Sequence, residues 1–269
     1  MFDEKEIIGE NNTGREQADL IFSLSDVTFG YAESEPVLKH VNFQIKRGER
    51  ISILGANGCG KSTLLKILAG LIFPLQGDFT AFGHKMDSRH FSEDYAKEYH
   101  RRVGYIFQDS DVQLFCSTVY DEIAFGPLQL GTDEQTVQKH VKEMCDLMEI
   151  SHLLGKTPYK LSGGEKKKVA LASVLILRPD ILIMDEPTND LDPRTQSWLI
   201  RLLATLHSAG KTLIFATHNL ELVREVSDRA ILFDENHTIA ADLPVLDILR
   251  REDLLVRVNL VDENYRYAD

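Results

Sequence analysis

The 269-residue sequence has few cysteines, no long apolar run and no excess of basic residues. Its three cysteines, Cys59, Cys116 and Cys145, are odd in number and widely spaced, which argues against a disulfide framework or a metal-binding cysteine cluster and fits a reducing compartment. The longest mostly apolar stretch, 64–73, covers about ten residues, whereas a membrane-spanning helix needs about 20. The 30 basic and 42 acidic residues give a net charge of −12, which disfavours direct nucleic-acid binding. Any role at a membrane is therefore expected to depend on a partner.

The chain is expected to contain one large domain between two shorter terminal segments. Residues 1–18 are polar, with an acidic start that lacks the apolar core of a signal peptide, and they predict a flexible lead-in. Residues 19–240 are predicted to form the main domain, with a helical subdomain inserted at about 109–178. Residues 241–269 are predicted to form a helix and a polar tail.

The strongest motif is GANGCGKS at positions 55–62, which fits G-x-x-x-x-G-K-[ST]. In this motif backbone N–H groups surround a phosphate chain, the lysine reaches the outer phosphates and the hydroxyl binds Mg²⁺. The apolar run 51–54 predicts a strand before the loop, and 62–69 predicts a helix after it, whose N-terminus attracts an anion. We therefore predict a nucleoside triphosphate site with Mg²⁺. Its expected binding residues are Gly55, Asn57, Gly58, Cys59, Gly60, Lys61, Ser62 and Thr63.

Short apolar runs alternate with helical patterns along most of the chain, which indicates an α/β fold with a parallel sheet buried on both faces. Asp192 with Pro193 predicts the start of a helix that Gly210 ends. Within the helical insertion, Thr132 and Gln135 fit a capping box. The predicted strands are 21–24, 27–29, 37–43, 51–54, 79–82, 103–107, 181–184, 212–216 and 230–233, and the residues predicted to form the core of the insertion are Val137, Val141, Met144, Leu147 and Met148.

Polar residues follow several of the predicted parallel strands, where ligands of such sheets bind. Each position alone has an ordinary explanation, such as a helix cap, but together they match the needs of phosphoryl transfer, which are charge neutralisation and an oriented water. The expected roles are phosphate neutralisation by Lys61, Mg²⁺ binding by Ser62, Asp185 and Gln108, orientation or deprotonation of water by Glu186, and a hydrogen bond from His218 to the γ-phosphate. Gln108 would also link nucleotide state to the helical insertion.

Two further signals each allow two interpretations. The segment 161–165, LSGGE, is a capping box at a helix start, yet its two glycines would also let a phosphate approach the first helical turn. Tyr31 follows a predicted strand and either packs against the domain or stacks on a base. The lysine run directly after Glu165, Lys166 to Lys168, is predicted to form the solvated face of the helix that begins at this segment.

Taken in order, these motifs resemble those of the ATP-binding-cassette ATPases, from about residue 20 to 240. The resemblance implies a P-loop core with a mainly parallel sheet, similar to that of RecA, an N-terminal antiparallel β subdomain and an inserted α-helical subdomain. It implies that Tyr31 stacks on adenine. It also implies a head-to-tail dimer with a second ATPase subunit, in which Ser162, Gly163 and Gly164 of one subunit contact the ATP held by the P-loop of the other.

Residues 107–115 and 124–128 look like those of the energy-coupling-factor importers of cobalt, nickel and vitamins. This resemblance implies a peripheral ATPase on the cytoplasmic face of the cell membrane, where a groove receives a helix from a transmembrane subunit. Leu114, Phe115 and Val119 would then contact that helix, or else belong to the core of the insertion. The alternatives are an exporter ATPase, which shares the same core, and a soluble cassette protein.

Three residues depart from the family pattern. Glu165 stands where glutamine is commoner, and Asp190 replaces a small residue, which leaves the dimer geometry open. Cys59 lies in the P-loop, and if it is exposed its alkylation is expected to block ATP binding. The presence of Lys61, Glu186 and His218 argues against a regulatory module that has lost catalysis.

Overall fold

The computed structural model describes residues 20–31 and 35–266, and these form two compact units. One unit comprises residues 97–211, and the other comprises the described residues of 14–96 and 212–269. The predicted flexible lead-in, 1–18, lies outside the described residues. The P-loop belongs to the second of these units and residues 108–191 to the first, so each unit carries part of the predicted chemistry.

The P-loop unit begins with an antiparallel sheet, as the family resemblance implied. Its strands are β1 (Leu20–Phe29), β2 (Leu38–Lys46), β4 (Gln76–Ala81) and β5 (His84–Lys85), in the order β2-β1-β4-β5. Strand β2 alternates buried and exposed residues over most of its length, which is typical of a sheet with one face on a core. Phe22 and Phe79 pack across neighbouring strands with ring centroids 5.8 Å apart.

The same unit contains the parallel strands that carry the P-loop. Strand β3 (Arg50–Leu54) pairs in parallel with β8 (Thr212–Ala216) on one side and with β9 (Arg229–Phe233) on the other. Residues 51–54 and 212–216 are all buried, as the continuous apolar runs predicted. The loop after β3 leads into α2 (Lys61–Leu68), and α9 (Leu220–Val226) follows β8.

The C-terminal segment differs from the prediction of a helix and a tail. Strand β10 (Ile239–Pro244) comes first and pairs antiparallel with β9, where Arg229 binds Asp242 at 2.6 Å. Helices α10 (Val245–Leu249) and α11 (Glu252–Arg257) follow. Both contribute to a core with Val223 and Leu232. Pairing with a distant strand, which local sequence does not encode, decided the conformation of β10.

The unit of residues 97–211 contains two parallel strands, β6 (Val103–Ile106) and β7 (Ile181–Asp185), with Ile106 opposite Met184. Helix α3 (Glu93–Arg102) precedes β6, within a stretch that the sequence indicated only as polar. Tyr99 is its one buried residue, and the helix is strongly polar overall, so the sequence has no apolar run there that would indicate a packed helix. At its end Arg102 binds Asp180 at 2.9 Å.

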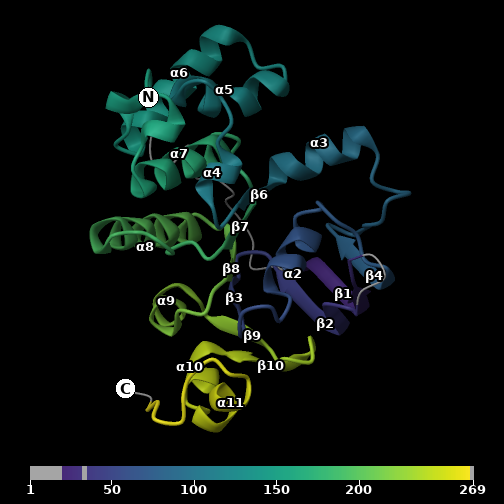
Figure 1. The fold of residues 1–269 in the computed structure, drawn as a ribbon. Helices are drawn as coiled ribbons and strands as arrows, with labels where there is room; N and C mark the ends of the chain where they lie inside the picture. The colour runs from purple at the N-terminus through teal and green to yellow at the C-terminus, as the bar shows by residue number, and fades with distance from the viewer. Residues whose placement is uncertain (1–19, 32–34, 267–269) are drawn as a thin grey trace. The chain divides into compact units, whose positions relative to one another are not determined.

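Four helices follow β6 and precede β7 in the sequence: α4 (Ser110–Gln113), α5 (Val119–Gln129), α6 (Glu134–Leu147) and α7 (Gly163–Leu175). Helices α5, α6 and α7 pack together (Figure 1). Four of the five predicted core residues are buried, and Leu147 is half-buried. Helix α6 is capped by Asp133, which accepts from the N–H of Thr136 at 2.9 Å, so the predicted cap at Thr132 is wrong by one residue. Helix α8 (Pro193–Ser208) begins after Asp192 as predicted. No helix among the described residues is both long and apolar enough to cross a membrane.

Candidate functional site

The P-loop ends at Gly60, which is the N-cap of α2 and has no side chain to satisfy the helix amides. Gly60 has φ +109°, and a Cβ there would lie 2.3 Å from the carbonyl oxygen of Val37. Only glycine fits this position, because any side chain would meet both a left-handed backbone and a steric clash. The first N–H groups of α2 are therefore left for an anionic ligand.

Lys61 lies at the start of α2 and is 7% exposed. Its ammonium donates to the carbonyl oxygens of Gly55 at 2.8 Å and Ala56 at 3.2 Å, both within the P-loop. These are the bonds that a phosphate would replace, since an ammonium exchanges neutral acceptors for charged ones favourably. The lysine is thus already held over the predicted phosphate site.

Cys59 is buried rather than exposed, so the condition for alkylation at the P-loop is not met. A Cβ on Gly55 would lie 2.5 Å from its sulfur, which shows how closely the thiol packs under the loop. Burial raises the pKa of the Cys59 thiol, although the nearby Lys61 ammonium acts in the opposite direction. A buried thiol with a raised pKa reacts slowly.

Tyr31 and His218 belong to the same unit as the P-loop and α2. The Tyr31 hydroxyl is 3.3 Å from the Thr63 hydroxyl, while its ring is 46% exposed and meets the Phe29 ring edge-on. Thr217 donates its N–H to the carbonyl of Ile53 at 3.2 Å, which brings the exposed His218 to the same strand end as the loop. The P-loop and His218 thus follow neighbouring parallel strands of this unit, as predicted.

His237 also contacts the P-loop, although no sequence pattern indicated this contact. Its Nδ1 lies 3.2 Å from the carbonyl oxygen of Cys59. The residue stands in the turn between β9 and β10, where it has φ +67°. A single histidine in a polar turn has no distinguishing pattern, so only the fold could reveal this contact.

Gln108, Asp185 and Glu186 lie near matching ends of β6 and β7 in the other unit, because Ile106 pairs with Met184. The side chains of Asp185 and Glu186 are 5% and 6% exposed. Glu186 has φ +43°, an uncommon conformation for a residue other than glycine. Such strain often accompanies functional positions, because the surrounding structure must hold the residue there.

The LSGGE segment forms the N-terminus of α7, and its capping interpretation is confirmed. Ser162 is the N-cap, and the Glu165 carboxylate accepts from its N–H and its hydroxyl, both at 2.8 Å. These hydrogen bonds lower the pKa of Glu165, with the backbone N–H of Ser162 as the largest cause. Ser162 and Gly163 remain exposed, so the capping box leaves them open to a further ligand.

The lysine run after this segment is not the solvated face that its charge predicted. Lys167 is 3% exposed and donates to two backbone carbonyls, those of Phe107 and Gln108. Lys166 binds Asp111 at 2.5 Å, and the Lys168 ammonium lies 4.6 Å from the centre of the Trp198 ring. The side chains are drawn inward because acceptors and an aromatic face lie alongside α7, and lysine stems bury readily when the amine has partners.

A cavity of about 340 Å³ lies between α7 and the segments that follow β6 and β7. A Cβ on Gly163 would be 3.7 Å from the carbonyl of Asp190, so the α7 N-terminus and the loop after Glu186 lie close together. The lining residues are Gln108, Asp109, Ser110, Asp111, Gly163, Lys166, Lys167, Asn189, Asp190 and Leu191. The structure thus brings Gln108 and Gly163 to one cavity.

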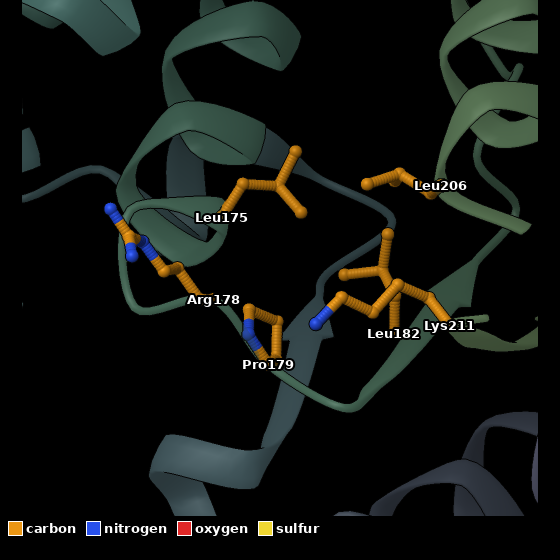
Figure 2. Close-up of a pocket in the computed structure, with 6 residues that line it drawn as sticks. All are labelled: Leu175, Arg178, Pro179, Leu182, Leu206 and Lys211. Carbon is orange, nitrogen blue, oxygen red and sulfur yellow. The ribbon is translucent and has the colours of Figure 1, made fainter. Parts of the chain in front are cut away.

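A second pocket in this unit is far smaller. Its volume is about 10 Å³, which is at most the space of one water molecule and too little for a ligand. Figure 2 shows the residues around it, which are Leu175, Arg178, Pro179, Leu182, Leu206 and Lys211.

Asp190, which stands where the family has a small residue, fits the local backbone conformation of its loop. It has φ +60°, in the left-handed region that aspartate tolerates better than most residues. Its effect on a dimer interface stays a prediction.

The three residues predicted to meet a membrane partner have different environments. Phe115 is 67% exposed, whereas Leu114 is half-buried and Val119 is fully buried in the insertion. For Val119 the alternative of a core residue is therefore correct. Phe115 instead pairs with Phe125, with ring centroids 5.1 Å apart, and Phe125 is itself 43% exposed.

Comparisons with known proteins agree with this architecture. The family model of the ABC transporter matches residues 38–189. The chain is 43% identical to the nickel import ATP-binding protein NikO of Rhodobacter capsulatus, over 89% of this chain and 95% of that protein. It is 36% identical to the energy-coupling factor transporter ATP-binding protein EcfA of Methanothermobacter thermautotrophicus, over 89% and 76% of the two chains.

A solved structure of cbiO1 from Clostridium perfringens, described as part of the ABC transporter complex cbiONQ, superposes with a TM-score of 0.76. It is 32% identical and covers 90% of this chain and 95% of that one. The match in sequence, fold and motif order leads to one conclusion: the chain belongs to the ABC transporter family and is an ATP-binding-cassette ATPase.

Proposed function

We propose that this ATPase is the subunit of an energy-coupling-factor importer that hydrolyses MgATP to drive uptake of nickel, cobalt or a vitamin. It would act peripherally on the cytoplasmic face of the cell membrane, through a transmembrane partner. The observation that carries the proposal is an exposed apolar surface in the helical insertion, in a chain whose relatives include a nickel import protein.

That surface is named here the docking surface. It consists of Val112, Phe115, Phe125, Leu128 and Leu130, which are 42–70% exposed. Among them, the rings of Phe115 and Phe125 are in contact, and exposed apolar side chains that lie together are typical of interaction sites. We assign it to a helix of the transmembrane partner, because an apolar helix face fits an apolar surface.

ATP is assigned to the P-loop unit. The uncapped N-terminus of α2 and the Lys61 ammonium suit the phosphates, and the exposed ring of Tyr31 beside Thr63 suits adenine. The remaining loop residues, Gly55, Asn57, Gly58, Cys59 and Gly60, would supply backbone N–H groups.

Mg²⁺ is assigned to Ser62, Asp185 and Gln108. Their hydroxyl, carboxylate and amide oxygens are the hard donors that this ion prefers, so the donor set fits it. When bound, the ion would neutralise charge on the phosphates. The buried Asp185 carboxylate would then have a cation to offset its desolvation.

Hydrolysis is assigned to the predicted catalytic residues. Glu186 would orient the attacking water or accept its proton, and His218 would donate to the γ-phosphate. Gln108 would contact the water or the metal and, since α4 begins two residues later, would relay nucleotide state to the docking surface. Ser162, Gly163 and Gly164 would contact the nucleotide of a second ATPase subunit, in a homodimer or a heterodimer.

The test is to purify the tagged chain from detergent-solubilised native membranes and to identify the co-purifying proteins by mass spectrometry. We expect a polytopic membrane protein together with a small substrate-binding membrane component. An exporter would instead bring one membrane protein whose transport assay shows efflux. Recovery of soluble complexes alone, under conditions that preserve a known transporter, would contradict the importer assignment and leave the ATPase intact.

A further inference from the structure

Lys167 is the buried cation of the 97–211 unit that the predicted chemistry does not use. It lies one turn into α7, and its ammonium donates to the carbonyl oxygens of Phe107 and Gln108, each at 3.2 Å. A single side chain therefore holds two consecutive carbonyls of the segment that carries the Gln108 side chain.

A second side chain ties the same segment to the same helix. Gln113 accepts from the N–H of Phe107 at 3.2 Å and donates to the carbonyl of Ala170 at 3.3 Å. Lys167 and Ala170 lie three residues apart on α7, so they occupy one face of the helix. The backbone at 107–108 is thus held from its carbonyl side by Lys167 and from its N–H side by Gln113.

Burial makes the Lys167 contacts consequential. The side chain is 3% exposed, and burial lowers its pKa, while Asp109, Asp185 and Asp190 act in the opposite direction. Burying a lysine costs side-chain entropy, and its ammonium is costly to desolvate. A lysine that served only to keep the surface soluble would therefore be more stable exposed to water. Lys167 also lines the cavity of about 340 Å³ together with Gln108 and Gly163.

We propose that Lys167 is a positioning residue for ATP hydrolysis, which fixes the backbone at Gln108 relative to the N-terminus of α7. It acts through Gln108 and touches no reacting atom. The proposal rests on the role assigned to Gln108 above. It also gives α7 a direct mechanical link to Gln108: a shift of the Ser162–Gly164 end of the helix moves the two carbonyls that Lys167 holds.

The experiment is a double-mutant cycle on the full-length chain, with steady-state ATPase kinetics and binding of a fluorescent ATP analogue. K167M should lower kcat about tenfold while leaving the Kd for the analogue within about twofold, because a misplaced group costs rate more than binding. In the Q108A background, K167M should lower kcat by less than about twofold, since the residue through which it acts is gone. K168M is the matched control on the same helix, and its effect should be equal in both backgrounds.

Each outcome bears on one claim. ATP hydrolysis by the wild-type chain that is lost in E186Q would support the ATPase assignment. If the wild-type chain does not hydrolyse ATP, the proposed function is contradicted. With hydrolysis present, an undiminished kcat in K167M, or equal losses with and without Gln108, would overturn the role of Lys167. If K167M does not fold, the same cycle is run with K167Q, whose shorter side chain can donate to a buried carbonyl but does not reach both, so the same loss of kcat is expected.

Discussion

The carboxylate of Glu122 accepts a hydrogen bond from the backbone N–H of Cys116 at 2.7 Å. It also accepts from the N–H of Phe115 at 3.0 Å, and Glu122 itself is 4% exposed. A buried negative charge on α5 therefore holds the segment that presents Phe115 to solvent. Because two N–H donors offset its desolvation, the charge is tolerated there.

This relationship makes the Cys116 thiol unreactive at neutral pH. Burial and the nearby Glu122 charge raise the pKa of Cys116 to about 11. Since the thiolate is the nucleophile, the rate of maleimide labelling should increase about tenfold for each unit by which the pH is raised, until the pH reaches that pKa. E122Q removes the charge, so we expect its rate–pH midpoint to shift to lower pH and its rate at pH 8 to increase.

The measurement is the pH dependence of maleimide labelling, followed by mass spectrometry. C116S is the control, since Cys59 and Cys145 are both buried. A faster rate in E122Q without a shifted midpoint would indicate loosening of the segment rather than a change in the pKa, and an unchanged rate would contradict the electrostatic account.

Glu186→Gln should abolish turnover and leave ATP binding intact. The substitution preserves the shape of the side chain but removes a base next to the expected water, so we expect kcat to fall by at least about 100-fold. ATP that binds without hydrolysis should accumulate in dimers, measured by light scattering with ATP and with ADP. Normal turnover would remove Glu186 from its assigned role.

His218→Ala should also impair hydrolysis more than binding. Its exposed ring follows β8 beside the P-loop strand, where it can donate to a γ-phosphate. Losing one such donor is expected to reduce kcat by about 10–100-fold. His207→Ala, in the last turn of α8, is the control. Unaffected ATPase activity in His218→Ala would contradict the assignment.

Phe115→Asp should prevent assembly with the membrane partner without affecting ATP hydrolysis by the isolated chain. A charge on the docking surface would have to be desolvated on binding, which costs several kcal/mol when the charge lacks a partner. Tyr159→Asp is the matched control, since Tyr159 is 70% exposed in the same unit. The yield of co-purified membrane protein is measured for both, and equal yields would place the partner elsewhere.

Glu165→Gln should flatten the pH dependence of stability in acid. Hydrogen bonds from Ser162 lower the folded-state pKa of Glu165, so the stabilisation is present above the unfolded-state value of about 4.3 and is lost as the pH falls through the folded-state value. Glutamine has no such titration and can still accept from the Ser162 N–H. At pH 7 the free energy of unfolding should change by less than about 1 kcal/mol.

Denaturant unfolding between pH 3 and pH 7 checks this prediction. As the pH is lowered, the free energy of unfolding should decrease more for wild type than for E165Q. A difference that stays constant across that range would show that the cap does not depend on the charge of Glu165.

Several features followed directly from local patterns. The P-loop, its flanking strand and helix, the buried run before Asp185 and the cap at Asp192 were all predicted, because glycine at special dihedrals and apolar strands are encoded within a few residues. The capping box at Ser162 was likewise confirmed, since it needs only residues three positions apart.

Other features escaped prediction for equally specific reasons. Helix α3 is polar almost throughout and buries only Tyr99, so no apolar run marks it. Helix α6 starts after Asp133 because the side chain of that residue, and not that of Thr132, caps the helix. Strand β10 depends on pairing with β9, and the lysines after Glu165 were mistaken for a solvated face.

The sequence by itself therefore determined the family, the phosphate-binding loop and most of the strands, since these depend on neighbours in the chain. Tertiary structure alone decided the environments of Lys167, Cys59 and Val119. A charged, thiol or apolar side chain can be buried or exposed according to what distant segments bring against it. For Lys167 those partners are carbonyls 59 and 60 residues away, a relationship that no local pattern encodes.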